Sequence, residues 1–299
     1  MENFYQPTIN DELEILESIT GKTKEFLLTH KEFKIKNERT NKFRELIKRL
    51  KNGEPLAYLI GYKYFYSSKF LVNKSVLIPR PESEILVDLA LKEIIKRKDN
   101  MLNILEVCTG SGCITVSILK ELEENKFREK VKITATDISK RALKIALKNS
   151  NDLLKNTWID TQGFNQKENY QFNNLTDSNS HDSLLLRHAN VFPETNNERF
   201  DLIIGNPPYI ETTEVDHLKE SVKKYEPRLA LDGGKNGMDI YLKIFKRLKN
   251  NCKKQTVFIL EINHTTSGLL HSITNKYFPE KEAIIQKDLY GKKRYLTIR

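Results

Sequence analysis

One short motif in this sequence predicts chemistry most clearly: Asn206-Pro207-Pro208-Tyr209. It follows the apolar run 200–205. Because prolines cannot continue a central strand, the chain must leave its sheet there, at the carboxyl end where such folds bind ligands. The Asn206 side-chain oxygen and the Pro207 carbonyl can each accept a hydrogen bond from one NH2 group, and Tyr209 can stack on the plane of that group. The pattern therefore predicts a site for a planar amino or amide nitrogen.

A second group of mostly small residues lies between an expected strand and an expected helix: Glu106, Cys108, Thr109, Gly110, Ser111 and Gly112. Small residues let the backbone approach a ligand closely, and a helix N-terminus offers free N–H groups. Asp137 ends the next expected strand, where an acid in a doubly wound sheet accepts hydrogen bonds from both ribose hydroxyls of a nucleoside. A nicotinamide dinucleotide needs three glycines around its pyrophosphate, whereas this run begins with an acid that suits an amino-bearing cation. The pattern therefore favours S-adenosylmethionine.

The two sites together predict methyl transfer to nitrogen. An amide nitrogen is a poor nucleophile, because its lone pair is delocalised into the carbonyl. Hydrogen bonds from both of its N–H groups to fixed acceptors would return electron density to nitrogen, and in-line placement against the sulfonium methyl would orient the attack. No strong base is needed, since the methylated amide loses a proton readily. This agrees with the six scattered histidines, of which His264 and His271 are interpreted as surface residues on a helix.

The elements that must position these residues differ along the chain. Residues 8–53 have apolar residues at helical spacing, and residues 58–78 are rich in aromatic and β-branched residues, as is typical of a hairpin. From residue 101 apolar runs alternate with helical patterns, which predicts a largely parallel sheet with helices on both faces. We expect an α/β, Rossmann-like methyltransferase sheet in a chain of three parts: an N-terminal helical domain (1–57), a β-hairpin linker (58–78) and a catalytic domain (79–299).

Within the catalytic domain we expect strands at 102–109, 131–137, 184–190, 200–206, 256–262, 283–287 and 295–298, and helices at 113–122 and 139–149. The last two strands can pair as an antiparallel hairpin at one edge of the sheet. Residues 150–182 are rich in Asn, Asp, Ser and Gln and show no clear period, so we interpret them as a surface insertion.

The composition excludes several classes of protein. Of the 299 residues, 38% are hydrophobic, which excludes wholesale disorder. No apolar run approaches the ~18 residues that a membrane span needs. The three cysteines form no CxxC pair, so we expect a reducing cytosol, no disulfide framework and no metal site.

The sequence resembles the HemK/PrmC family in several motifs, which follow in the family's order over about residues 53–299: 53–61, 76–84, 109–112, 206–210 and 225–237. The resemblance implies an enzyme that transfers a methyl group from S-adenosylmethionine to the glutamine side-chain amide nitrogen of the Gly-Gly-Gln motif in peptide-chain release factors. The N-terminal helices would help to grip the release factor. We expect a cytoplasmic monomer that requires neither a membrane nor nucleic acid.

The resemblance also implies roles for individual residues. Cofactor contacts fall on 108–112, Asp137, Val191 and Asn206. Contacts to the substrate glutamine fall on 206–209, and Arg80 and Ser83 would help to hold the cofactor or the acceptor. The Pro-Arg-Pro-Glu form of residues 79–82 favours the release-factor enzymes over the sister enzymes that methylate a ribosomal-protein glutamine.

Three positions depart from the family's usual residues: Glu106 for Asp, Cys108 for Gly and Asn190 for Asp. The segment 261–266 also lacks the family's Gly and Gln. A cysteine at position 108 is compatible with the cofactor only if its φ is negative, because a side chain would otherwise crowd the site. These departures bear on the affinity for cofactor and not on the reaction class.

The net charge of +10 supports an alternative, an amino methyltransferase that acts on adenine in nucleic acid, since the adenine NH2 is equally planar. Nearly all of the excess lies in residues 240–299, which hold 13 basic and 4 acidic side chains. We place five of the basic residues on one solvated helix face: Lys243, Lys246, Arg247, Lys253 and Lys254. A weak contact with ribosomal RNA or with an acidic release-factor surface is the sharper hypothesis for them. A further alternative is a non-catalytic binding module with a degraded cofactor turn.

Overall fold

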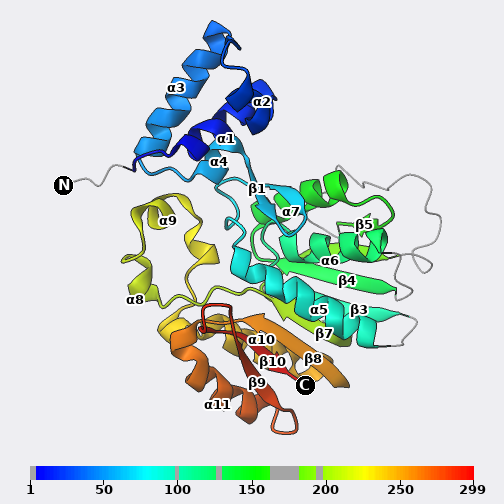
Figure 1. The fold of residues 1–299 in the computed structure, drawn as a ribbon. Coiled ribbons are helices and arrows are strands. Elements are labelled where there is room, and N and C mark those ends of the chain that lie inside the picture. Colours follow the sequence, from blue (N-terminus) through cyan, green and yellow to red (C-terminus); the bar gives the residue numbers. More distant parts are fainter. Residues whose placement is uncertain (1–4, 98–100, 126–129, 162–181, 193–197) are drawn as a thin grey trace.

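The computed structural model describes residues 5–97, 101–125, 130–161, 182–192 and 198–299, and Figure 1 shows how they are arranged. A group of helices near the N-terminus stands at one end of a large sheet, which is covered by helices on both faces. None of the helices in these ranges combines the length and the apolar character that a bilayer crossing requires.

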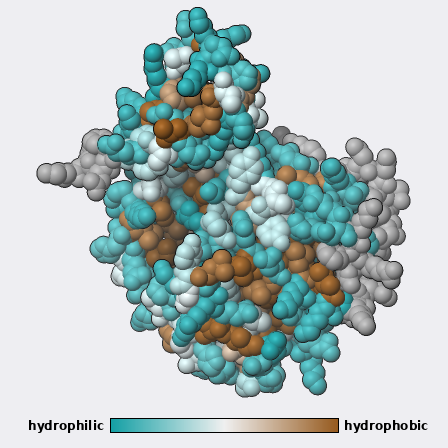
Figure 2. Space-filling model, in the orientation of Figure 1, coloured by the Kyte–Doolittle hydropathy of each residue, from teal (hydrophilic) through white to brown (hydrophobic). Residues whose placement is uncertain are grey.

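The N-terminal region is helical, because its apolar residues recur at helical spacing. Ile15, Leu46 and Leu50 are buried together in a small core of their own. Thr8 caps the first helix in a capping box with Asp11. Figure 2 shows that hydrophobic residues also gather on the surface of these helices. The helices are α1 (Ile9–Thr20), α2 (Lys24–Thr29), α3 (Asn37–Lys51) and α4 (Leu56–Ile60).

A two-stranded antiparallel hairpin follows, formed by β1 (Tyr62–Phe65) and β2 (Ser68–Leu71). The Phe65 and Phe70 rings meet edge to face at 6.0 Å, and both belong to the main core of the catalytic part. The boundary expected between residues 57 and 58 falls inside α4, which leads through one glycine into β1. The hairpin is therefore packed as part of the catalytic body and is joined closely to the N-terminal helices.

The catalytic part is built on an eight-stranded sheet with the order β5-β6-β4-β3-β7-β8-β10-β9. The strands from β5 to β8 in this order are parallel, and β10 pairs antiparallel with both β8 and β9. The expected edge hairpin is therefore confirmed. The strands are β3 (Leu102–Val107), β4 (Val131–Asp137), β5 (Trp158–Asp160), β6 (Ser183–His188), β7 (Phe200–Gly205), β8 (Cys252–Glu261), β9 (Ala283–Lys287) and β10 (Lys293–Ile298).

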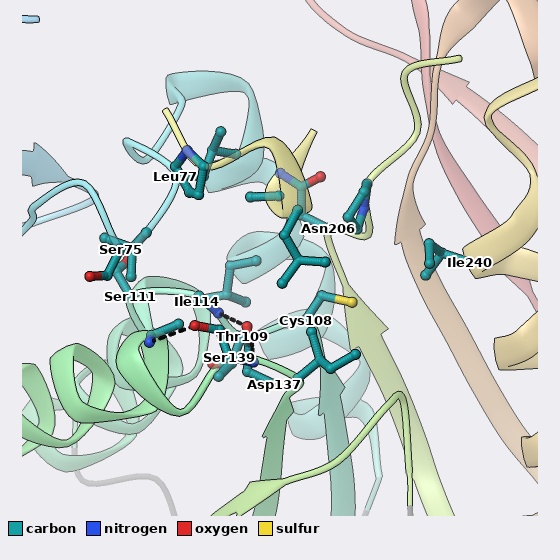
Figure 3. Close-up of a pocket in the computed structure, with 18 of the residues that line it drawn as sticks. Ser75, Leu77, Cys108, Thr109, Ser111, Ile114, Asp137, Ser139, Asn206 and Ile240 are labelled. Carbon is teal, nitrogen blue, oxygen red and sulfur yellow. Dashed lines mark hydrogen bonds between the residues drawn. The ribbon is translucent and has the colours of Figure 1, made fainter. Parts of the chain in front are cut away.

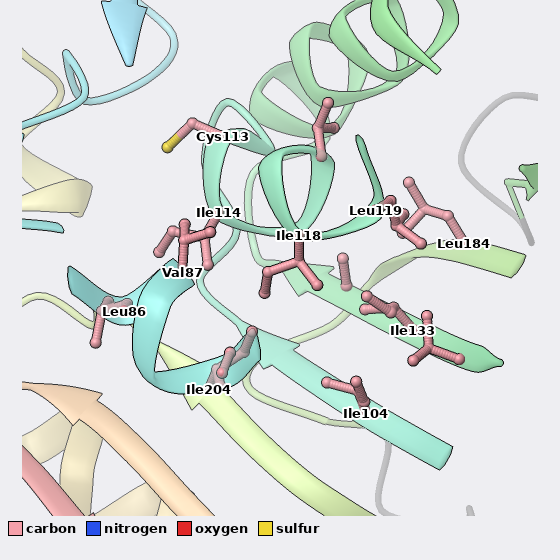
Figure 4. Packing of buried hydrophobic residues seen from close by; sticks show 14 of the residues in the cluster. Leu86, Val87, Ile104, Cys113, Ile114, Ile118, Leu119, Ile133, Leu184 and Ile204 are labelled. Carbon is pink, nitrogen blue, oxygen red and sulfur yellow. The ribbon is translucent and has the colours of Figure 1, made fainter. Parts of the chain in front are cut away.

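Side chains alternate between the two faces of the sheet, and each face packs against its own helices. Ile104 belongs to the cluster under α5, α6 and α7, which Figure 4 shows, whereas Leu105 belongs to the cluster under α10 and α11. The longer helices are α5 (Glu84–Lys96), α6 (Cys113–Glu124), α7 (Lys140–Leu153), α10 (Asp239–Leu248) and α11 (Ser267–Tyr277). The short ones are η1 (Pro81–Ser83), α8 (Thr212–Val215), α9 (Glu220–Tyr225), η2 (Arg228–Ala230), η3 (Lys235–Gly237), η4 (Lys249–Asn251) and η5 (His264–Thr266).

The segment interpreted as an insertion begins later than expected. α7 continues to Leu153 and β5 adds an outer strand, so residues up to 161 belong to the sheet domain. The sequence hid this strand because it has only three residues and no clear alternation. Residues 162–181 lie outside the described part of the chain, and the interpretation of that stretch stays a prediction.

The basic residues near the C-terminus do not share one helix face. α10 ends at Leu248, and Lys253 and Lys254 lie on β8. Lys253 is paired with Asp201 at 2.8 Å. The helical pattern continues in the sequence across residues 249–251, where a 3-10 turn ends the helix, and this is why periodicity misplaced the lysines. His264 and His271 are exposed, as predicted.

Candidate functional site

The carboxyl ends of β3, β4 and β7 meet at one pocket, which Figure 3 shows in close-up. The strand order reverses beside β3, which is where open α/β sheets bind ligands. The predicted residues that line the pocket are Arg80, Ser83, Cys108, Thr109, Gly110, Ser111, Asp137, Val191, Asn206 and Pro208. Four further predicted residues are not among the lining residues: Glu106, Gly112, Pro207 and Tyr209.

The turn after β3 is held against Asp137, the last residue of β4. The Gly110 amide donates to Asp137 Oδ2 at 2.9 Å, and the Ser139 amide donates to Oδ1 at 2.7 Å. Burial raises the pKa of the Asp137 carboxyl, and these two amides oppose that effect. Each carboxylate oxygen can accept a further hydrogen bond, as the hydroxyls of a ribose would require.

Glu106, on β3, is buried and only partly satisfied. Its Oε2 accepts from the Thr109 hydroxyl at 2.6 Å and from the Thr115 hydroxyl. Its Oε1 is buried and has no hydrogen-bond partner among the described residues. Burial raises the pKa of this carboxyl to about 7. A buried acceptor with unused capacity calls for a donor. Glu106 does not itself line the pocket, but Thr109, whose hydroxyl it holds, does, so Glu106 supports the turn that faces a cofactor.

Cys108 does not meet the condition of a negative φ. Its φ is +59°, in the left-handed region that costs a residue with a Cβ about 1 kcal/mol or more. The side chain lines the pocket and packs against the cluster of α10 and α11. The turn geometry after β3, and not the residue type, imposes this φ. Burial raises the pKa of the thiol above its ordinary value, which favours the neutral thiol.

Val191 also has a left-handed backbone, with φ at +73°, which is a strained conformation for a β-branched residue. Its carbonyl accepts from the Thr136 hydroxyl at 2.5 Å. The Arg247 guanidinium donates to the carbonyls on either side, those of Asn190 and of Phe192, the latter at 3.0 Å. Arg247 was expected on a solvated face, but it holds a loop of the pocket wall, because α10 lies directly against that loop.

Asn206 is joined to a chain of hydrogen bonds that the sequence did not predict. Its Nδ2 donates to Ser83 Oγ at 2.9 Å, and the Ser83 hydroxyl donates to Glu261 Oε2 at 2.6 Å. The Tyr209 hydroxyl donates to the other Glu261 oxygen at 3.2 Å. The structure therefore connects Tyr209 to Asn206 through Glu261, although Tyr209 does not itself line the pocket.

Arg80 forms an ion pair with a buried acid, Glu226. Its guanidinium lies 2.5 Å from Glu226 Oε1, and the Ile78 amide donates to Glu226 Oε2 at 3.2 Å. Glu226 precedes Pro227 and Leu229, which line the pocket. Arg80 thus fastens one wall of the pocket to the segment before α5, and it also lines the pocket itself.

Several lining residues were not predicted: Ser75, Leu77, Ile114, Ser139, Ile240 and Lys243. Ser139 did carry a signal, because a serine after a strand-ending acid is a typical helix N-cap, and it caps α7. Ile240 and Lys243 come from α10, far along the chain, and no local pattern indicates that they reach this pocket. Lys243 is exposed, as predicted, and also lies at the pocket wall.

The pocket thus offers the Asp137 carboxylate as an acceptor for a ribose near the β3 turn, and an amide oxygen after β7. Together with the strand order, this defines the class of S-adenosylmethionine-dependent methyltransferases. The PrmC N-terminal domain model matches residues 11–61, and the Eco57I restriction-modification methylase model matches residues 124–288. A release factor glutamine methyltransferase of Clostridium botulinum is 34% identical over 287 residues, which cover 95% of this chain and 89% of that protein. The chain belongs to the release factor glutamine methyltransferase family, HemK/PrmC.

The chain is also similar to a longer curated protein and to a solved structure. A bifunctional methyltransferase of Rickettsia typhi is 32% identical over 300 residues, which cover 95% of this chain. This chain spans about half the length of the first curated relatives that it matches, 52% in this case. A solved S-adenosylmethionine-dependent methyltransferase from Agrobacterium tumefaciens matches with a TM-score of 0.44 and 11% identity, covering 79% of this chain and 68% of that one. The predicted family, fold class and cofactor are confirmed.

We expect Glu106→Gln to stabilise the protein at pH 8 and to weaken its affinity for S-adenosylmethionine. The pKa of Glu106 is raised from 4.5 in the unfolded chain to about 7 in the folded protein. The protonated side chain therefore contributes fully to stability below pH 4.5, and this contribution is lost as the pH rises through about 7. Removing the charge should recover about 3 kcal/mol at pH 8 and little at about pH 4. Thermal unfolding at the two pH values and calorimetry with cofactor measure both effects. Equal stability of variant and wild type at pH 8 would contradict a costly buried charge.

We expect Arg247→Met to lower the affinity for S-adenosylmethionine about tenfold, because the strained loop at Val191 loses two charge-assisted hydrogen bonds. Lys246→Met is the matched control, since it removes the same charge from an exposed neighbour on α10 and should leave the affinity unchanged. Calorimetry on both variants makes the comparison. Equal affinities would show that Arg247 does not hold the loop for the cofactor.

Proposed function

We propose that this chain transfers a methyl group from S-adenosylmethionine to the side-chain amide nitrogen of the glutamine in the Gly-Gly-Gln motif of peptide-chain release factors. The observation that carries the proposal is the orientation of Asn206. Its Nδ2 is used by Ser83, at 2.9 Å, so Oδ1 is left to accept from a substrate N–H. The family of the chain and the names of its relatives support the same reaction.

The residues of the site have separate tasks in this proposal. When bound, S-adenosylmethionine supplies an electrophilic methyl group. Asp137 would hold its ribose, and Glu106 would act on the amino-group side through the turn at Thr109, whose hydroxyl it holds. Asn206 Oδ1 and the Pro207 carbonyl would each accept from one N–H of the substrate amide, which orients the nitrogen and increases its electron density. Tyr209 would pack against the amide plane.

The protein partner follows from the same proposal. The N-terminal helices, with their exposed hydrophobic residues such as Ile9 and Leu28, would bind the release factor outside the Gly-Gly-Gln loop. Release factors act in the cytoplasm, so we place the enzyme there, as a monomer. Contact with ribosomal RNA is not required for transfer to a protein side chain.

A second candidate is an amino methyltransferase that acts on adenine in nucleic acid. The match of residues 124–288 to the Eco57I restriction-modification methylase model favours it, since this range includes Asn206 and Tyr209. The two acceptors share a planar NH2, so the pocket alone fits both. The N-terminal helices, which match the PrmC N-terminal domain, favour the protein substrate.

The direct test is mass spectrometry of a release factor, of ribosomal proteins and of DNA and RNA, each after incubation with the protein and S-adenosylmethionine. We expect one added methyl group on the Gly-Gly-Gln glutamine and none on nucleic acid. Transfer to nucleic acid alone would favour the adenine enzyme, and methylation of a ribosomal protein at glutamine would favour the sister family.

We expect Asn206→Ala to lower the transfer rate by about a hundredfold or more, because one acceptor for the substrate amide is lost. The affinity for cofactor should change much less, since Glu106 and Asp137 remain. Asn125→Ala, which removes the same side chain from the exposed end of α6, is the control. Turnover of Asn206→Ala at the wild-type rate would remove the proposed role of this residue.

A further inference from the structure

A buried acid without an assigned role lies beside the acceptor site. Glu261 ends β8 and is 1% exposed. Its Oε2 accepts from the Ser83 hydroxyl at 2.6 Å, and its Oε1 accepts from the Tyr209 hydroxyl at 3.2 Å. The Arg294 guanidinium lies 3.9 Å from Oε1 and supports the charged form. From the sequence, residues 261–266 stand out only as a departure from the family pattern.

With Glu261 ionised beside Arg294, these hydrogen bonds run in one direction. An ionised carboxylate has no proton to donate, so the Ser83 hydroxyl must give its single proton to Glu261. Ser83 Oγ can then only accept from Asn206, and the group that donates to it is the Nδ2 of that amide, at 2.9 Å. The two ends of an amide have nearly the same shape, so packing alone does not choose between them. The charge of Glu261 makes that choice.

We infer that Glu261, acting through Ser83, is a positioning residue that turns the Asn206 oxygen toward the acceptor and so makes the pocket select an NH2 group over a carboxylate. The inference rests on the proposed function, in which Asn206 Oδ1 receives a substrate N–H. If the amide were reversed, its NH2 would face the substrate and would favour a carbonyl or carboxylate oxygen. Glu261 therefore sets the discrimination of glutamine from glutamate, which have the same shape.

Tyr209 helps to hold the Glu261 carboxylate in place. Its hydroxyl is held by Glu261, and the Glu261 backbone carbonyl accepts from the Tyr241 hydroxyl at 2.6 Å. The carboxylate thus has a fixed place, set by β8 on one side and by the Asn-Pro-Pro-Tyr turn on the other. Burial raises the pKa of Glu261, and the hydrogen bond from Ser83 and the charge of Arg294 act against this.

The test compares full-length variants with a Gly-Gly-Gln peptide and a matched Gly-Gly-Glu peptide. For Glu261→Gln we expect a kcat about tenfold lower with Gly-Gly-Gln, because a glutamine at 261 can donate to Ser83 and leaves the Asn206 amide free to turn. The affinity for cofactor should stay within about twofold. The ratio of affinities for the two peptides should fall about fivefold or more toward one. A merely structural role would not move this ratio.

Three further variants complete the test. Ser83→Ala removes the hydroxyl that joins Glu261 to Asn206 and should lower the ratio of peptide affinities equally. Ser83→Thr keeps a hydroxyl and should restore the wild-type ratio. Asp201→Asn is the stability control, since Asp201 is also a buried acid but lies at the start of β7 and pairs with Lys253; it should leave the ratio at its wild-type value.

Two outcomes distinguish failure of the proposed function from failure of the role of Glu261. If the wild-type protein transfers no methyl group to Gly-Gly-Gln, in the peptide or in a release factor, the proposed function fails and this inference falls with it. If the wild type transfers normally, and Glu261→Gln and Ser83→Ala keep the wild-type kcat and peptide ratio, only the role of Glu261 is overturned.

Discussion

The carboxyl ends of β3 and β7 pack so closely that only glycine fits between them, and the rest of the site depends on this contact. A Cβ on Gly205 would lie 2.6 Å from the Val107 carbonyl oxygen. A larger residue would separate the strands and, with them, the turns that begin at Cys108 and Asn206. The cofactor side and the acceptor side share one pocket because two parallel strands end side by side with no side chain between them.

Three carboxylates lie around this contact: Glu106 and Glu261, which are buried, and Asp137, which is partly exposed to the pocket. Burial raises the pKa of each, so each charge opposes folding near neutral pH unless hydrogen bonds or cations compensate. Backbone amides compensate Asp137, and two hydroxyls and Arg294 compensate Glu261. Glu106 keeps one oxygen unused. These buried charges lower the stability of the fold, but they place hydrogen-bond acceptors in position before a substrate binds.

Local patterns predicted those parts of the site that are continuous in sequence. The strand, turn and helix from Leu102 to Glu124 and the turn at Asn206 are where the sequence places them, because strand and helix periods and proline are local signals. The φ of Cys108 could not be predicted, since the turn imposes it and cysteine does not signal it. Lys253 was misplaced because a helical period continued past the end of α10.

The sequence by itself determined the fold class, the family and the residues that can bind an amino nitrogen. These follow from the order of strands and helices and from the chemistry of Asn206 and its neighbours. Only the tertiary structure showed that Glu261 is hydrogen-bonded to Ser83 beside the pocket and that Arg247 is hydrogen-bonded to the loop at Val191. Such contacts join residues far apart in the chain, for example 178 positions between Ser83 and Glu261. No local period encodes them, because they exist only once parallel strands have brought distant segments to one edge of the sheet.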